Sequence, residues 1–266
     1  MSLKIDLKGR RAAVTASTSG IGLAIAAGLA EAGADVVING RKPEVTEAAV
    51  ARLKERHPSP QIVGVSADLG QRDGVDQFIE RAGEIDILVN NLGIYERVDF
   101  FDITDAEWLR FFETNVMSGI RLARQYMPGM LAKNWGRLIF ISSESGVTTP
   151  RDRMHYAVTK SAMLAVARGL AEQARGTAVT SNSIIVGLTM TEHVERDIAR
   201  AAKEKSVSEM DIQRQIAAAH RPTQLLERLA TSEEVANMVT YIASSQASAT
   251  TGAALRVEGG GIPTIL

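Results

Sequence analysis

The chain has 266 residues, 30 basic and 31 acidic side chains, four histidines and no cysteine. The lack of cysteine excludes disulfides, cysteine-ligated metals and thiol catalysis. Because four histidines are too few for a histidine-rich site, we predict no metal. A net charge of −1 argues against general nucleic-acid binding, which requires a cationic surface. The composition is that of a globular protein with a sizeable core.

The sequence predicts neither a leader nor a membrane span. Residues 1–11 alternate apolar and charged side chains and lack the apolar core of a signal peptide. The most apolar stretch, residues 21–34, is too short to cross a bilayer. We therefore expect a cytoplasmic protein that has no membrane partner.

Strand-like and helix-like segments alternate along the whole chain. Apolar, β-branched runs predict strands at residues 12–15, 35–39, 61–66, 85–90, 136–142, 179–186 and 253–257. Helical periodicity predicts helices at residues 21–32, 42–56, 72–82, 105–133, 155–175 and 232–244. Continuously apolar strands are buried on both faces, as in a parallel sheet covered by helices. The pattern predicts one α/β domain over residues 1–266, a doubly wound Rossmann-type fold with a seven-stranded parallel sheet flanked by helices.

One polar, charged segment, residues 189–228, interrupts this alternation. Its apolar spacing indicates one or two amphipathic helices. It follows the carboxyl end of a predicted strand, the edge at which open sheets bind ligands. We therefore expect this insertion to be a substrate lid, with a solvated helical excursion as the alternative.

The first predicted strand runs into a helix through the small residues Thr15-Ala16-Ser17-Thr18-Ser19-Gly20-Ile21-Gly22. Small residues let the backbone approach a pyrophosphate, and a helix N-terminus offers free N–H groups to it. A tight turn that needs glycine only for packing is the alternative. The expected cofactor contacts in this turn are Thr15, Ser17, Ser19, Gly20, Ile21 and Gly22.

The ends of the next strands fit the same dinucleotide. Asp68 and Leu69 end the third strand, where a carboxylate can accept a hydrogen bond from adenine, and Asn91 and Gly93 follow the fourth. The second strand ends in glycine and then Arg41, where an acid would repel a 2′-phosphate. A guanidinium pairs well with phosphate. We predict NADP as the preferred cofactor and NAD as the alternative, while a solvated loop charge would also account for Arg41.

Tyr156 and Lys160 lie four residues apart, on one face of a predicted helix. A nearby ammonium favours the phenolate, so Lys160 is expected to lower the pKa of Tyr156 and make it a general acid–base. Ser143 ends the fifth strand, and its hydroxyl can hold a substrate oxygen. Asn115 is a poor helix former in a predicted helix, and we expect it to open the helix and bind a water that leads to Lys160.

Together these motifs resemble the short-chain dehydrogenase/reductase family, in order and spacing, over essentially the full chain. The resemblance is strongest to its 3-oxoacyl-acyl-carrier-protein reductase-like branch. It implies hydride transfer between NAD(P) and a carbonyl or alcohol, with catalytic residues Asn115, Ser143, Tyr156 and Lys160. By the same resemblance Lys160 binds the nicotinamide ribose, and Gly187, Thr189 and Thr191 contact the cofactor. Ala16 replaces a usual glycine, at little cost if its φ is negative.

The substrate stays open at the level of sequence. Glu144, Ser145 and Leu188 are candidate substrate contacts, although Glu144 can equally point to solvent. Residues 151–153 could line the substrate mouth, but a solvated charged loop is the favoured interpretation. We expect a small-molecule carbonyl or alcohol, with a 3-oxoacyl-acyl-carrier-protein as the alternative. A non-catalytic NADP sensor is disfavoured because no catalytic residue is missing. The resemblance and the apolar helix faces suggest a homotetramer, and a monomer could bury the same surfaces.

Overall fold

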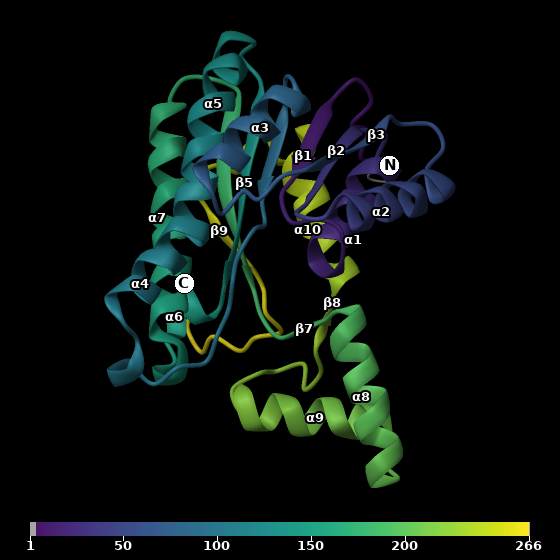
Figure 1. The fold of residues 1–266 in the computed structure, drawn as a ribbon, viewed down its shortest axis with the longest axis vertical. Helices are drawn as coiled ribbons and strands as arrows, with labels where there is room; N and C mark the ends of the chain where they lie inside the picture. The colour runs from purple at the N-terminus through teal and green to yellow at the C-terminus, as the bar shows by residue number, and fades with distance from the viewer. Residues whose placement is uncertain (1–3, 266) are drawn as a thin grey trace.

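The computed structural model describes residues 4–265. Residues 1–3, which belong to the segment for which no leader is predicted, and Leu266 lie outside this range. Seven parallel strands form one sheet in the order β3-β2-β1-β4-β5-β6-β9 (Figure 1). They are β1 (Arg11–Val14), β2 (Asp35–Gly40), β3 (Ile62–Ser66), β4 (Ile87–Asn90), β5 (Gly136–Ser143), β6 (Val179–Val186) and β9 (Ala254–Val257). The predicted Rossmann-type α/β fold is confirmed, and its strand order reverses between β1 and β4, where such sheets bind ligands.

Helices cover both faces of the sheet (Figure 1). One apolar core packs α1 (Gly20–Glu31), α2 (Pro43–Arg56) and α10 (Ser232–Ala243) against one face. A second core packs α3 (Arg72–Ala82), α5 (Ser118–Ala132) and α7 (Met154–Gln173) against the other. Both faces of the strands are therefore buried, which is why their sequences are apolar throughout. Among residues 4–265, no helix has the length and apolar composition needed to cross a membrane.

The helix predicted at residues 105–133 is interrupted. It comprises α4 (Asp105–Phe112), a π-helical turn at Glu113–Met117, and α5. Asn115 lies in this turn, and its side chain bonds to the backbone of Ile94 instead of facing solvent. A π-turn accommodates one wider step of the backbone and is common at functional sites. The expected local opening of the helix at Asn115 is confirmed.

The polar insertion contains two helices, α8 (Glu192–Lys205) and α9 (Glu209–His220), which extend beyond the sheet (Figure 1). Its base is closed by two short parallel strands, β7 (Thr189–Met190) and β8 (Ala230–Thr231). The helices share a small apolar cluster formed by Ile198, Ala202, Ile212 and Leu229. The insertion thus has a core of its own, which fits the amphipathic spacing of its sequence.

An ion pair fastens the end of the insertion to α10. The guanidinium of Arg228 donates to both carboxylate oxygens of Glu234, at 2.7 and 2.9 Å. Glu234 also accepts from the backbone N–H of Thr231 and completes a capping box at the start of α10. These contacts, led by the hydrogen bond from Arg228, lower the pKa of Glu234 to about 2.

We predict that Glu234→Gln lowers the free energy of unfolding by about 1 kcal/mol near pH 7, after discounting for the partial exposure of the pair. Because the folded pKa lies below the unfolded one, this stabilisation is present above about pH 5 and is lost as the pH falls toward 2. Urea unfolding between pH 7 and pH 3.5 measures it. Glu233→Gln, at an exposed neighbour, is the matched control. The prediction is contradicted if the difference in free energy of unfolding between the unaltered protein and Glu234→Gln does not shrink below pH 4.5.

Candidate active site

Thr15 and Asn91 join the ends of β1 and β4 at the point where the strand order reverses. The Thr15 hydroxyl accepts hydrogen bonds from the backbone N–H groups of Asn91 and Leu92, both at 2.9 Å. The Asn91 amide donates to the carbonyls of Thr15 and Ala16, both at 3.0 Å. These two predicted cofactor residues therefore lie together, and their side chains hold the glycine turn in place.

The turn itself is shaped by close backbone approach. A Cβ atom at Gly22 would lie 2.4 Å from the carbonyl oxygen of Ala16 and 2.6 Å from the Asn91 amide, so only glycine fits. Ser17 is fully buried, donates to the Val14 carbonyl and accepts from the Asn39 N–H, so its hydroxyl serves the turn. Ala16 has a φ of 49°. The condition for a strain-free alanine, a negative φ, is therefore not met.

The N-terminus of α1 follows the carboxyl end of β1 through the glycine turn. Its N-cap residue Ser19 makes no side-chain cap, and the N–H groups of Ile21 and Gly22 have no partner within residues 4–265. The N–H of Gly20, in contrast, donates to the carboxylate of Glu192 at 2.8 Å. Glu192 begins α8, so the insertion contacts the predicted phosphate-binding turn directly. No local pattern indicated this contact, because the two residues are far apart in the chain.

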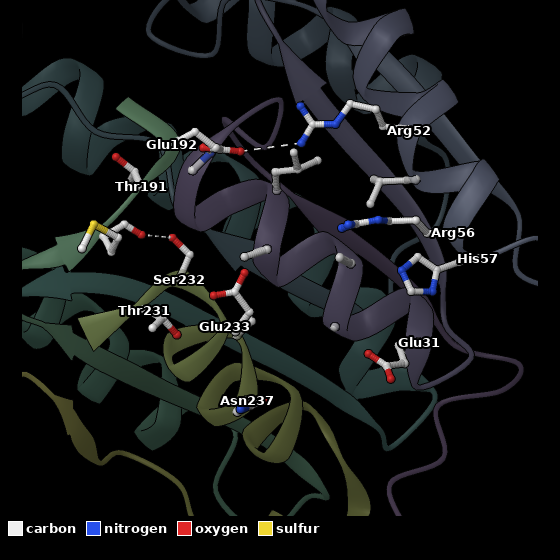
Figure 2. A pocket seen from close by; sticks show the side chains of 18 of the residues that line it. Glu31, Arg52, Arg56, His57, Thr191, Glu192, Thr231, Ser232, Glu233 and Asn237 are labelled. Atoms are coloured by element: carbon white, nitrogen blue, oxygen red, sulfur yellow. Dashed lines mark hydrogen bonds and ion pairs between the residues drawn. The ribbon is translucent and has the colours of Figure 1, made fainter. Parts of the chain in front are cut away.

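A groove of about 780 Å³ runs along the outer face of α1 (Figure 2). Arg52, Arg56 and His57 of the α2 segment line one side, and Glu192 and Glu233 line the other. Arg52 reaches across to Glu192, with 3.6 Å between their charged atoms. The groove borders the glycine turn at Gly20 but contains none of the predicted catalytic residues, so it is separate from the catalytic cavity.

The remaining predicted cofactor residues on the strand ends differ in what they offer. Arg41 is exposed directly after β2, and no ion pair engages it within the described chain. Asp68 is exposed and accepts from the N–H of Gly70. Leu69 is buried in the core, which leaves only its backbone for a ligand. Gly93 lies beside Lys160, and a Cβ there would approach the ammonium to 3.2 Å.

Ser143, Tyr156 and Lys160 line one cavity of about 190 Å³ at the carboxyl end of the sheet, together with Gly93 and Gly187. The Ser143 oxygen accepts from the N–H of Ser145, and its hydroxyl lies next to the Tyr156 phenol. Lys160 is buried and donates to the Ile141 carbonyl at 2.9 Å. The spacing of the motifs therefore placed a hydroxyl, a phenol and an amine around one space.

Burial sets the titration of this group. It raises the pKa of Tyr156, and the neighbouring Ser143 hydroxyl and the charge of Arg153 oppose the rise only in part. It also lowers the pKa of Lys160 to about 8. The ammonium lies 5.6 Å from the centre of the phenol ring. The expected net lowering of the tyrosine pKa by Lys160 is therefore wrong for the protein by itself, because desolvation outweighs the neighbouring charges.

Asn115 connects the π-turn to the catalytic helix. Its amide nitrogen donates to the Ile94 carbonyl at 3.1 Å and to the Thr159 hydroxyl at 3.0 Å, and its oxygen accepts from the Ile94 N–H at 2.7 Å. Thr159 directly precedes Lys160. The Asn115 side chain therefore positions the loop after β4 against α7, with all three contacts supplied by protein.

The loop after β6 carries the other predicted residues. A Cβ at Gly187 would lie 2.7 Å from Cα of Glu258, so the two chain segments touch. Thr189 donates to the Gly187 carbonyl, and Thr191 caps α8 while its methyl group lies against Gly20. Leu188 packs against the apolar cluster of the insertion. The loop thus lies between the glycine turn and the insertion.

Glu144 and Ser145 bind the far end of the insertion. Arg221, just after α9, donates to the buried Glu144 carboxylate at 2.5 Å and to the Ser145 hydroxyl at 3.4 Å. Burial nevertheless raises the pKa of Glu144, and the nearby carboxylate of Glu258, which accepts from a backbone N–H, adds to the rise. Glu144 therefore does not point to solvent, and one of its oxygens already has an arginine partner.

Of two residues near the cavity, the sequence analysis missed Tyr95 and favoured a solvated position for Arg153 over one at the substrate mouth. Tyr95 lies edge-on to Tyr156, with ring centres 5.1 Å apart. Arg153 packs its guanidinium over Tyr95, 5.3 Å from the ring centre, and is buried. The predicted solvated loop at residues 151–153 is therefore wrong for Arg153. Aromatic spacing gave no signal for this, because the contacts come from separate loops.

Comparisons with known proteins agree with this geometry. A family model described as "Enoyl-(Acyl carrier protein) reductase" matches residues 15–261. The chain is 43% identical to "Uncharacterized oxidoreductase YvaG" of Bacillus subtilis, covering 97% of this chain and 98% of the relative. It is 31% identical to a D-beta-hydroxybutyrate dehydrogenase of Rhizobium meliloti, covering 94% and 98%. The solved L-sorbose reductase of Gluconobacter frateurii superposes with a TM-score of 0.89 at 31% identity, covering 99% and 100%.

The fold, the glycine turn and the serine–tyrosine–lysine cavity define a Rossmann-type oxidoreductase. The chain belongs to the short-chain dehydrogenase/reductase family, as its motifs indicated. It is an NAD(P)-dependent oxidoreductase.

We predict that Ala16→Gly raises the free energy of unfolding by about 1 kcal/mol, because glycine adopts a positive φ without the steric penalty that alanine carries. The expected rise in Tm is about 3 °C. Ala24→Gly, in the interior of α1, is the matched control and should destabilise by about 1 kcal/mol. A Tm that falls for Ala16→Gly would contradict the strain at this position.

Proposed function

We propose that the chain transfers hydride between NADP(H) and the carbonyl or alcohol carbon of a small molecule, with Tyr156 as the acid–base. The observation that supports this most directly is the convergence of Ser143, Tyr156 and Lys160 on one cavity beside the glycine turn. When bound, the cofactor supplies or accepts the hydride. The fit of a dinucleotide is supported by the free N–H groups at the start of α1 and by a turn at Gly22 that has no room for a side chain.

Each side chain then has a distinct task in reduction. The raised pKa of Tyr156 keeps the phenol protonated near neutral pH, so it can donate a proton to the developing alkoxide. Ser143, whose hydroxyl lies next to the phenol, donates to the same oxygen and stabilises its charge. A charged Lys160 favours the phenolate that remains and holds the ribose of the cofactor. Asn115 positions α7 and is the candidate end of a proton relay to Lys160.

NADP is the proposed cofactor, with NAD as the alternative. The support is Arg41, an exposed guanidinium without an ion-pair partner in the described chain, at the end of the strand that precedes α2. No acid occupies this strand end to repel a 2′-phosphate. Asp68, Gly187, Thr189 and Thr191 complete the proposed cofactor contacts.

The substrate class is open between two kinds of small molecule. The relatives include one enzyme named for a hydroxy acid and one named for a neutral ketose. Reduction of a 3-oxoacyl-acyl-carrier-protein is the second candidate, which the relatives named 3-oxoacyl-[acyl-carrier-protein] reductase favour. An acidic carrier protein requires exposed basic residues at the mouth, and the burial of Arg153 removes one of them.

The organisation of the protein is part of the proposal. We expect one domain over the whole chain, with residues 189–228 as the lid over the substrate, in a cytoplasmic homotetramer without nucleic-acid or membrane partners. The contact between Glu192 and Gly20 supports the lid, because it joins the insertion to the cofactor turn. The chain ends in an apolar tail at residues 261–266, which is a second candidate for a subunit interface. Ile265 in this tail is fully exposed, and Leu266 lies outside the described residues.

Tyr156→Phe is expected to lower kcat by about 10²- to 10⁴-fold, because it removes the proton donor and leaves the ring in place. The Kd for NADPH, measured by fluorescence titration, should stay within about twofold. Retention of near-normal turnover by this variant would refute the proposed acid–base.

Arg41→Ala is expected to raise the Kd for NADPH by about 10- to 100-fold, the effect of losing a charge-assisted hydrogen bond to phosphate. The Kd for NADH should change by less than about threefold. Lys42→Ala, at the exposed neighbour, serves as the control. Equal losses of NADPH and NADH affinity would show that Arg41 does not recognise the 2′-phosphate.

A further inference from the structure

Arg153 is a buried cation that packs over Tyr95, a residue that lines the catalytic cavity. Its side chain is only 9% exposed, although it belongs to a short charged run in the loop before α7. Burying a guanidinium is costly unless hydrogen bonds replace its water. An N–H group of Arg153 that lacks a protein partner is therefore a candidate for binding a ligand.

One edge of the guanidinium is occupied and the other is free. Asp152 accepts from Nε and from Nη2, both at 2.8 Å, which fills the side-on edge. Nη1 has no hydrogen-bond partner within residues 4–265. It is not fully enclosed by the protein, so a ligand can reach it. The planar fork of arginine presents Nη1 and the second N–H of Nη2 in parallel, a match for two carboxylate oxygens.

This free edge belongs to a residue close to the acid–base. The Tyr95 ring contacts both groups, with the Arg153 guanidinium 5.3 Å and the Tyr156 ring 5.1 Å from its centre. The charge of Arg153 also acts on Tyr156, where it opposes the rise in pKa caused by burial, and on His220 at the end of α9, where it adds to the lowering caused by burial. A group a few bonds from a carbonyl held at Tyr156 therefore comes near Arg153.

Arg153 shares its carboxylate partner with a second arginine. Arg97 and Arg153 share the single carboxylate of Asp152, with the Arg97 guanidinium 3.6 Å away. Arg221 is already engaged by Glu144 and by a backbone carbonyl. Arg153 therefore does not have the charge of Asp152 to itself, and its free edge can pair with a further carboxylate.

We propose that Arg153 binds the carboxylate of the substrate, so that the enzyme acts on short oxo- or hydroxy-carboxylic acids in preference to neutral ketoses and alcohols. This inference rests on the proposed hydride transfer at Tyr156 and specifies its substrate class. Arg153 holds the acid end of the molecule, while Ser143 and Tyr156 hold the oxygen that reacts. The same edge offers less to a terminal hydroxyl, which carries no charge to pair with it.

Two matched substrate pairs test the inference on the unaltered protein. One is 5-keto-D-gluconate with L-sorbose, and the other is acetoacetate with 4-hydroxy-2-butanone; within each pair a carboxylate replaces a hydroxymethyl group. NADPH oxidation at 340 nm should give a kcat/KM at least about tenfold higher for the acid in one or both pairs. Equal or better reduction of the neutral members would overturn the inference and leave the proposed oxidoreductase intact. Reduction of none of the four would count against both.

Variants of Arg153 separate recognition from loop structure. Arg153→Gln should lower kcat/KM for the acid by about 10- to 100-fold, mainly through KM, and change the neutral member by less than about threefold. Arg153→Lys should lower kcat/KM for the acid by less, because it keeps the charge. Some loss should remain, because an ammonium cannot pair with two carboxylates from two edges. Arg151→Gln, exposed on the same turn, is the control for loop effects.

Melting temperature and NADPH affinity verify that each variant is folded. Equal losses for acid and neutral substrates in a folded Arg153→Gln or Arg153→Lys protein would show that Arg153 only supports the loop, and would overturn the inference.

Discussion

The amide of Asn91 is the contact on which the site depends. It bonds to two consecutive carbonyls of the turn after β1, while the N–H of the same residue bonds to the Thr15 hydroxyl. The turn is thereby drawn against the end of β4, and Gly22 is the residue small enough for that approach. Because β1 and β4 are the strands at which the sheet reverses its order, this contact aligns the start of α1 with the catalytic cavity.

Desolvation is the second constraint, and it sets the chemistry of the cavity. A buried phenol is held in its neutral form, and a buried ammonium binds its proton less firmly. The two groups have similar pKa values when free in water. In the cavity the pKa of Tyr156 is the higher of the two. The site is thus prepared to donate a proton, which is what reduction of a carbonyl requires.

The insertion is held to the body at three places that lie far apart in the sequence. Glu192 contacts the glycine turn, Arg221 pairs with Glu144 beside Ser143, and the segment ends in the ion pair that fastens it to α10. Two of these ties touch residues next to the cofactor turn and the catalytic serine. A change at the cofactor turn or beside the catalytic serine therefore affects the position of the insertion, because both sites contact it directly.

The sequence by itself determined the Rossmann-type fold, the order of the motifs along the chain and the grouping of Ser143, Tyr156 and Lys160, since apolar periodicity and short-range spacing encode them. The opening of the helix at Asn115 was also readable, because asparagine fits a regular helix poorly. Tertiary structure alone decided the positive φ of Ala16, the burial that raises the tyrosine pKa and the free edge of Arg153. Each depends on atoms from segments distant in the chain, and neither local propensity nor residue spacing carries that information.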